Sequence, residues 1–195
     1  AATGTGNSIT QPVGVTNALG VATGSFSSTV SEAKTLSATA NGQAIVATAA
    51  VNVVPDAASA SESLVSASES SIIAGSGSSV ITVTARDVNG NPVPGVSVTL
   101  EASAVDVDIT QPIAVTDANG ETTGSVTGTI VGTKTITARL NGVAALATVD
   151  VEVTPAAPST ALSTASATPT SISAGTGTSV ISVTVRDAFG NLVPN

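Results

Sequence analysis

The chain contains no histidine, cysteine, methionine, tryptophan or tyrosine, and its two aromatic residues are Phe26 and Phe189. Without histidine and cysteine it lacks the commonest acid–base, nucleophilic and transition-metal groups of enzymes. No disulfide can form, so the fold has to be stabilised by packing and hydrogen bonds. We therefore expect a protein that is not an enzyme, with no catalytic residues and no cofactor.

Positive charge is also scarce. Five Lys and Arg residues stand against thirteen Asp and Glu residues, which gives a net charge of -8. Because phosphate binding needs clustered cations and stacking groups, we expect no nucleic-acid partner. The longest apolar runs are only a few residues, against the roughly 20 that a membrane-spanning helix needs, so no membrane insertion is expected within this segment.

Ala, Val, Ser, Thr and Gly supply most of the chain, and this composition favours strands and turns. The phrase ITQPIAVTDANGETTG at residues 109–124 nearly repeats ITQPVGVTNALGVATG at residues 9–24. The self-similarity continues beyond this phrase without a gap, as it does in a tandem array. A period of about 100 residues suits a whole β-sandwich domain.

Apolar and polar residues alternate with period two between turn signals, as they do in half-buried strands. This pattern predicts strands at residues 71–74, 81–86, 96–100, 109–116, from about 122, 133–140 and 147–153. About seven strands per repeat is the number found in a constant-type immunoglobulin sandwich. The expected fold is all-β, with tandem immunoglobulin-like β-sandwiches: part of a repeat at residues 1–55, a complete repeat at 56–155 and part of the next at 156–195.

Turn residues separate the predicted strands. Glycine accepts positive φ, and Asp or Asn side chains can bond the backbone of a turn. The Asn-Gly pair at 141–142 is the strongest hairpin signal in the chain. The residues assigned to turns are Asp87, Gly90, Asn91, Asp117, Gly120, Asn141 and Gly142.

Calcium is the alternative interpretation of several acidic positions, because oxygens of Asp, Asn and the backbone are its usual ligands. The candidate ligands are Asp87, Asn89, Asn91, Asp106 and Asp108. Their counterparts one hundred residues away are Asp187, Phe189, Asn191, Gly6 and Ser8. A site needed by every repeat should persist in both copies, so we favour turn capping by the two retained aspartates over calcium binding.

Two lysines, Lys34 and Lys134, occupy equivalent positions. We interpret both as surface residues that discourage edge-to-edge pairing of strands. An internal crosslink between lysine and asparagine is the alternative.

Four motifs follow one another through the complete repeat, and copies of them cover both flanking pieces. They lie at Val83–Asp87, Gly90–Gly95, Thr116–Gly120 and Gly132–Ala138. Together they resemble the bacterial Ig-like domains of the invasin and intimin type (group 1), which occur in tandem in bacterial surface adhesins. The resemblance implies an extracellular or cell-surface location and a structural role in a stalk or filament, and it carries over no receptor site.

The alternative function is an adhesin segment that binds a host protein or glycan through loops or a strand edge. The expected partners are neighbouring repeats of the same or of identical chains. Two arrangements remain open for the partial repeats: they belong to a longer array, or complementary pieces of successive copies pair into one sandwich.

Overall fold

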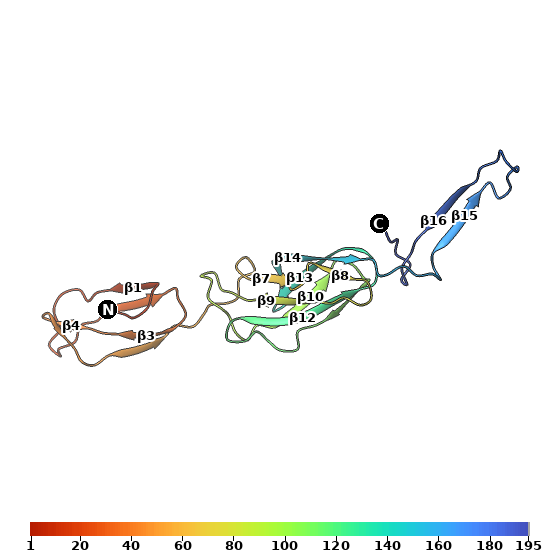
Figure 1. Ribbon diagram of the computed structural model, residues 1–195. Coiled ribbons are helices and arrows are strands. Elements are labelled where there is room, and N and C mark those ends of the chain that lie inside the picture. The colour runs from red at the N-terminus through yellow and green to blue at the C-terminus, as the bar shows by residue number, and fades with distance from the viewer. Residues whose placement is uncertain (195) are drawn as a thin grey trace.

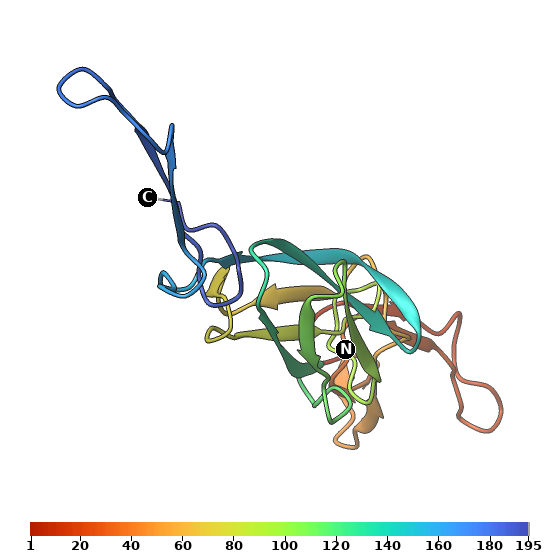
Figure 2. The same cartoon turned by 90° about the vertical axis from the view of Figure 1, so that its right-hand side faces the viewer.

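The computed structural model describes residues 1–194, and their side chains except at residues 143–147. Within this range every regular element is a β-strand. These residues contain no helix that is long and apolar enough to cross a membrane. Three parts follow one another along an extended molecule: an N-terminal part (1–54), a central sandwich (57–154) and a C-terminal part (156–194) (Figure 1). In the perpendicular view the C-terminal part projects from the central sandwich as a narrow hairpin (Figure 2).

The strands are shorter in the flanking parts than in the centre. Those of the N-terminal part are β1 Asn7–Thr10, β2 Ser25–Ser28, β3 Ala33–Leu36, β4 Thr39–Ala40, β5 Gln43–Ala44 and β6 Ala49–Asn52. Those of the central sandwich are β7 Leu64–Ala67, β8 Ser71–Ile73, β9 Ser79–Thr84, β10 Val98–Ala102, β11 Val107–Thr110, β12 Glu121–Gly128, β13 Gly132–Leu140 and β14 Val143–Thr154. Those of the C-terminal part are β15 Thr164–Thr168 and β16 Val180–Thr184.

Two four-stranded sheets face each other in the central sandwich. One has the order β10-β13-β14-β8 and the other the order β11-β12-β9-β7. The alternation read from the sequence places one face of each strand between the sheets, and Ile81, Ile136 and Val151 have no exposed surface. Burying an aliphatic side chain of this size stabilises a fold by about 2 kcal/mol. The core consists of small aliphatic side chains, without an aromatic residue.

The predicted all-β sandwich is confirmed, and so is the strand expected at 133–140, which is β13. It leads into β14 through Asn141 and Gly142, whose φ angles of 49° and 82° are the two positive values of a type I′ hairpin turn. The Asn141 side chain also accepts a hydrogen bond from the Ser97 backbone N–H at 3.1 Å.

Two strand predictions were wrong. The strand expected at 109–116 is β11, which ends at Thr110, because Pro112 has no N–H to donate to a ladder. Strand β7 was missed, since the serine-rich segment around it has the composition of a linker. Its pairing with β9 brings the strands of the central sandwich to eight.

Gln111 closes the edge of β10. Its Oε1 accepts a hydrogen bond from the Leu100 N–H at 2.7 Å, and its Nε2 donates to the Leu100 carbonyl at 2.8 Å. These two bonds use the backbone groups with which a foreign strand would pair.

The flanking parts contain only two-stranded sheets, namely β1-β2, β3-β6, β4-β5 and β15-β16. Positions that form the core of the central sandwich are exposed in the C-terminal part: Ile81 has no exposed surface, whereas its counterpart Ile181 is 63% exposed. Among the described residues the closed core is therefore that of the central sandwich.

Candidate functional site

The loop at residues 87–91 follows β9 and faces the N-terminal part. Its backbone forms a tight turn, in which Gly90 N donates to Asp87 O at 3.0 Å and Asp87 N to Asn91 O at 2.9 Å. Gly90 has a φ of 82°, a value that a residue with a Cβ seldom adopts. The Arg86 guanidinium donates from Nη1 to the Gly90 carbonyl at 2.8 Å and so holds the loop against β9.

Asp87 is the centre of this loop and is 1% exposed. Its Oδ1 accepts hydrogen bonds from the backbone N–H groups of Asn89 and Asn91, both at 2.9 Å. Its Oδ2 accepts from Asn91 Nδ2 at 2.8 Å and from the backbone N–H of Asp56 at 3.1 Å. Because Asp56 lies in the linker from the N-terminal part, the Asp87 carboxylate ties that linker to the central sandwich.

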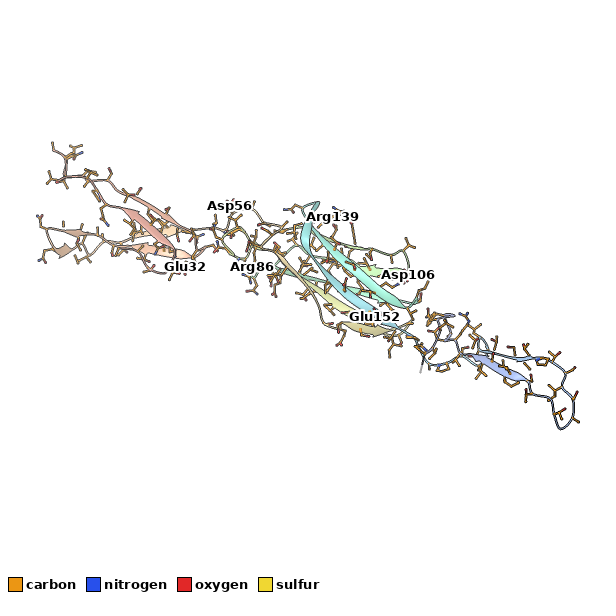
Figure 3. All side chains as sticks on the ribbon, turned by 90° about the horizontal axis from the view of Figure 1, so that it is seen from above. Glu32, Asp56, Arg86, Asp106, Arg139 and Glu152 are labelled. Atoms are coloured by element: carbon orange, nitrogen blue, oxygen red, sulfur yellow. The ribbon has the colours of Figure 1, made fainter. Side chains whose placement is uncertain are left out.

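Asn91 reaches further, into the N-terminal part. Its Nδ2 donates to the Thr29 carbonyl at 2.9 Å, and its Oδ1 accepts from the Ser31 N–H at 2.9 Å. Both partners belong to the turn between β2 and β3. We call the loop 87–91, the linker residue Asp56 and the turn 29–31 joint 1. The labelled side chains of Glu32, Asp56 and Arg86 lie together in this region (Figure 3).

The same arrangement recurs one hundred residues later as joint 2, formed by the loop 187–191, the linker residue Ala156 and the turn 129–131. Asn191 donates to the Thr129 carbonyl at 2.8 Å and accepts from the Val131 N–H at 3.2 Å. Asp187 Oδ2 accepts from Asn191 Nδ2 at 2.7 Å and from the Ala156 N–H at 3.0 Å. The C-terminal part is thus held to the central sandwich as the central sandwich is held to the N-terminal part.

The hydrogen bonds keep both aspartates ionised. Burial raises the pKa of Asp87, but hydrogen bonds from the Asn91 side chain and from the backbone of Asp56, Asn91 and Asn89 outweigh it, so its pKa lies below the ordinary value. The pKa of Asp187 is lowered in the same way, against its burial, by the Asn191 side chain and by backbone N–H groups that include Ala156. All of these donors are neutral, so the joints need no paired cation.

The five calcium candidates do not form one group: Asp87, Asn89 and Asn91 lie in the loop of joint 1, whereas Asp106 and Asp108 lie at β11. Asn89 is exposed, and Asp106 lies toward the other end of the central sandwich from Arg86 (Figure 3). Asp108 is exposed on β11. In residues 1–194, no three acidic side chains form a group that could hold a metal ion.

The interpretation of Lys34 and Lys134 as surface residues was wrong, because both are almost fully buried. Lys134 Nζ donates to Asp106 Oδ2 at 2.5 Å, and Lys34 pairs with Glu32 and donates to the Thr5 carbonyl at 2.8 Å. Burial of these lysines requires a partner for the charge. Neither lysine has an asparagine side chain among these partners, as the alternative crosslink would need.

The carboxylate that neutralises each lysine comes from a different position. Glu32 corresponds to Gly132, and Asp106 corresponds to Gly6. Gly132 has a φ of 122°, which excludes a glutamate at that position without strain. The ion pair is therefore kept in both copies although its acidic residue moves.

Asp117 and Gly120 form a second turn of the same type, in which the Gly120 carbonyl accepts a hydrogen bond from the Ala85 N–H at 2.7 Å. Asp117 Oδ1 accepts from the N–H groups of Asn119 and Glu121 at 2.8 and 2.9 Å, and these bonds, that of Glu121 first, lower the pKa of Asp117. Gly120 has a φ of 77°. This turn caps its own loop and reaches no neighbouring part.

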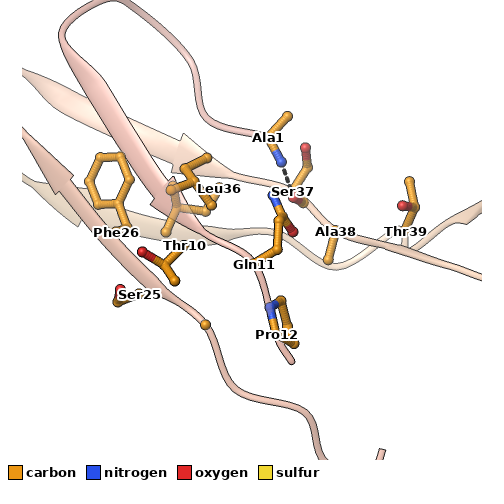
Figure 4. Close-up of a pocket in the computed structure, with 12 residues that line it drawn as sticks. Ala1, Thr10, Gln11, Pro12, Ser25, Phe26, Leu36, Ser37, Ala38 and Thr39 are labelled. Atoms are coloured by element: carbon orange, nitrogen blue, oxygen red, sulfur yellow. Dashed lines mark hydrogen bonds between the residues drawn. The ribbon is translucent and has the colours of Figure 1, made fainter. Parts of the chain in front are cut away.

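A hollow of about 440 Å³ opens in the N-terminal part, and its apolar lining includes Ile9, Phe26 and Leu36 (Figure 4). Gln11 and Gly24 border it. Their counterparts in the central sandwich, Gln111 and Gly124, meet Leu100 of β10. The hollow is therefore the position of a strand in this fold, and we do not assign it to a small ligand.

The inter-part role of Asn91 was not predicted from the sequence, which assigned that residue to a turn. The available signal was the pattern of retention: Asp87 and Asn91 recur as Asp187 and Asn191, whereas Asn89 between them is replaced by Phe189.

Comparison with known proteins agrees with this fold. The model of the family described as bacterial Ig-like domain (group 1) matches residues 62–154. None of the curated proteins matches the chain.

Three solved structures of bacterial proteins are similar over nearly the whole chain. FdeC, an Escherichia coli adhesin, is 24% identical with a TM-score of 0.69, and the match covers 100% of this chain and 63% of that one. InvD of Yersinia pseudotuberculosis is 23% identical with a TM-score of 0.62, covering 99% and 61%. Invasin, described as a bacterial integrin-binding protein, is 24% identical with a TM-score of 0.61, covering 97% and 40%. The chain therefore spans less than two thirds of each, and at these identities the likeness shows the fold.

Proposed function

Since residues 62–154 are a bacterial Ig-like domain of group 1, we propose that the chain is a structural, non-catalytic segment of a bacterial cell-surface stalk or filament. In this proposal residues 1–55, 56–155 and 156–195 belong to three successive repeats that are joined in series. Two of the similar structures are those of an adhesin and of a bacterial integrin-binding protein, which supports a surface location.

The observation that carries the proposal is the repeated joint. Asp87 with Asn91, and Asp187 with Asn191, fasten both the linker and a turn of the preceding part through the same hydrogen bonds. A linker without such contacts would leave neighbouring domains free to reorient, which is the default for a small interface. Fastening the linker and the turn at each boundary restricts that motion and keeps the segment extended.

The central sandwich is also arranged to resist tension. Its β8 and β14 are parallel, with Glu152 N donating to Ser70 O and Ala74 N to Thr154 O, both at 2.9 Å. The chain enters from the side of joint 1 and leaves β14 toward joint 2, so tension pulls these two strands in opposite directions along their length. Their hydrogen bonds are then loaded together and do not open one at a time.

A second candidate function is binding through loops. The exposed Ile113 lies in the β11–β12 loop, and Val13 is equally exposed at the same position of the N-terminal part. Loops at the ends of strands are common binding elements of sandwiches. Binding through the β10 edge has less support, because Gln111 occupies it. Saturable binding of the chain to a glycan or a matrix protein, abolished by Ile113→Ser, would favour this second function.

Single-molecule stretching of the whole chain tests the structural proposal, with cysteines added at both termini because the sequence has none. We expect Ala74→Pro, which removes one N–H of the β8–β14 pair, to lower the unfolding force of the central sandwich. Val126→Ala serves as the control, because it removes core methyl groups from β12 and leaves that pair intact. Equal loss of force in the two variants, after matching for thermodynamic stability, would contradict the proposed load path.

A further inference from the structure

Joint 2 has a contact beyond those shared with joint 1. The Phe189 ring lies against Gly75, in the turn between β8 and β9, so closely that a Cβ at Gly75 would overlap it. At joint 1 the same loop position holds Asn89, an exposed polar residue. Joint 2 is therefore fastened at two turns of the central sandwich, the Gly75 turn and the turn 129–131 that Asn191 holds.

Both sides of this contact are held in place. Gly75 has a φ of 72°, and its N–H donates to the Gly128 carbonyl at 2.9 Å, which ties the turn to the end of β12. The backbone N–H of Phe189 donates to Asp187 Oδ1 at 2.9 Å. The carboxylate that anchors the joint therefore also fixes the backbone that carries the ring.

We propose that Gly75 is a socket for an aromatic side chain at the position of Phe189 in the following repeat, and that this pair decides which joints are braced against bending. Both joints share the linker contact and one turn contact, and a contact at a second turn restricts bending at joint 2 further than at joint 1. The inference rests on the proposed function, because it concerns repeats that act in series.

The socket requires glycine for steric reasons. Any Cβ at position 75 would displace the ring, and a positive φ is strained for other residues. Gly175, the counterpart in the C-terminal part, has a φ of 83° and open space where its Cβ would stand. The partner that this surface fits is therefore a repeat whose loop carries an aromatic residue at the position of Phe189.

Paired spin labels on the whole chain test the proposal. Thr123→Cys with Ser182→Cys spans joint 2, and Ala50→Cys with Thr123→Cys spans joint 1; all three residues are exposed. We expect a narrower distance distribution across joint 2 than across joint 1. Phe189→Asn introduces the residue found at this position in joint 1. It should broaden the distance distribution across joint 2 to the width of that across joint 1, and leave the distribution across joint 1 unchanged.

A matched pair of glycine variants separates the socket from backbone strain. Gly75→Ala should broaden the distance distribution across joint 2. Gly142→Ala should not, because Gly142 has a similar φ of 82° but open space where its Cβ would stand. In a chain that already carries Phe189→Asn, Gly75→Ala should have no further effect on the width, because the two residues act as one contact.

The outcomes distinguish this proposal from the one on which it rests. The socket is wrong, and the structural function stands, if the distance distribution across joint 2 is narrow and unchanged by Phe189→Asn. The same holds if Gly142→Ala broadens that distribution as much as Gly75→Ala does. Broad distributions across both joints of the unsubstituted chain would overturn the structural function and the socket together.

Discussion

The carboxylate of Asp87 orients the side chain of Asn91, which donates one Nδ2 hydrogen to Asp87 Oδ2 at 2.8 Å and is left with the other for the Thr29 carbonyl at 2.9 Å. Asp87, which is buried and caps its own loop, thus positions Asn91, whose side chain bonds to the neighbouring part. The same relation between Asp187 and Asn191 at the next boundary gives the segment its repeated joint.

Removing the crossing amide should release joint 1. In Asn91→Ala we expect NMR relaxation to report faster tumbling of the N-terminal part relative to the central sandwich, because the bonds to Thr29 and Ser31 are lost. Asn119→Ala is the control, since Asn119 occupies a similar turn at Asp117 that reaches no neighbouring part. Unchanged tumbling in Asn91→Ala would show that the linker alone holds the joint.

Acid should weaken the central sandwich through Asp87. Its pKa in the folded chain lies below the ordinary value of 3.8, so the unfolded chain binds the proton first as the pH falls. The stability that this carboxylate contributes is present above the ordinary value and is lost as the pH falls through the folded-state pKa.

Asp87→Asn tests that dependence by urea unfolding across this range. At neutral pH it should cost on the order of 2 kcal/mol, because an amide cannot accept all four N–H donors that meet the carboxylate. Its free energy of unfolding should then fall less steeply with acid than that of the unsubstituted chain. Asp108→Asn, on the exposed side of β11, controls for the change of net charge.

The buried lysine should depend on its carboxylate. Asp106→Ala leaves the Lys134 ammonium almost fully buried and without its ion-pair partner, so we expect a clear drop in the melting temperature. Adding Lys134→Met should recover part of the loss by removing the uncompensated charge. A double variant that is less stable than Asp106→Ala would contradict this account of the pair.

Calcium should leave the chain unaffected, because Asp87 already accepts two N–H donors on each oxygen and has no free lone pair for a cation. We propose that the joints work without metal. The melting temperature should be the same in calcium and in excess chelator, since a ligand bound to the folded state alone would raise it. A calcium-dependent increase would show a site that these hydrogen bonds do not explain.

The sequence predicted those features that follow from local patterns. Alternation identified β9 and β13, and Asn141-Gly142 identified the type of turn between β13 and β14, because period and turn chemistry are properties of neighbouring residues. Features that depend on residues distant in the sequence were not predicted. The burial of Lys134 depends on Asp106, 28 residues away, and the crossing bond of Asn91 on Thr29, 62 residues away. Strand β7 escaped because its composition matches a linker, although its pairing partner β9 makes it a strand.

The proposed function requires that the parts of the chain are fastened to one another at the joints. The most direct test is the distance distribution between spin labels at Ala50→Cys and Thr123→Cys, in a chain that has no other cysteine. A fastened joint 1 gives a single narrow distribution, which should broaden in Asn91→Ala. A distribution that is already broad, with no response to Asn91→Ala, would mean that joint 1 is a flexible tether and would contradict the account.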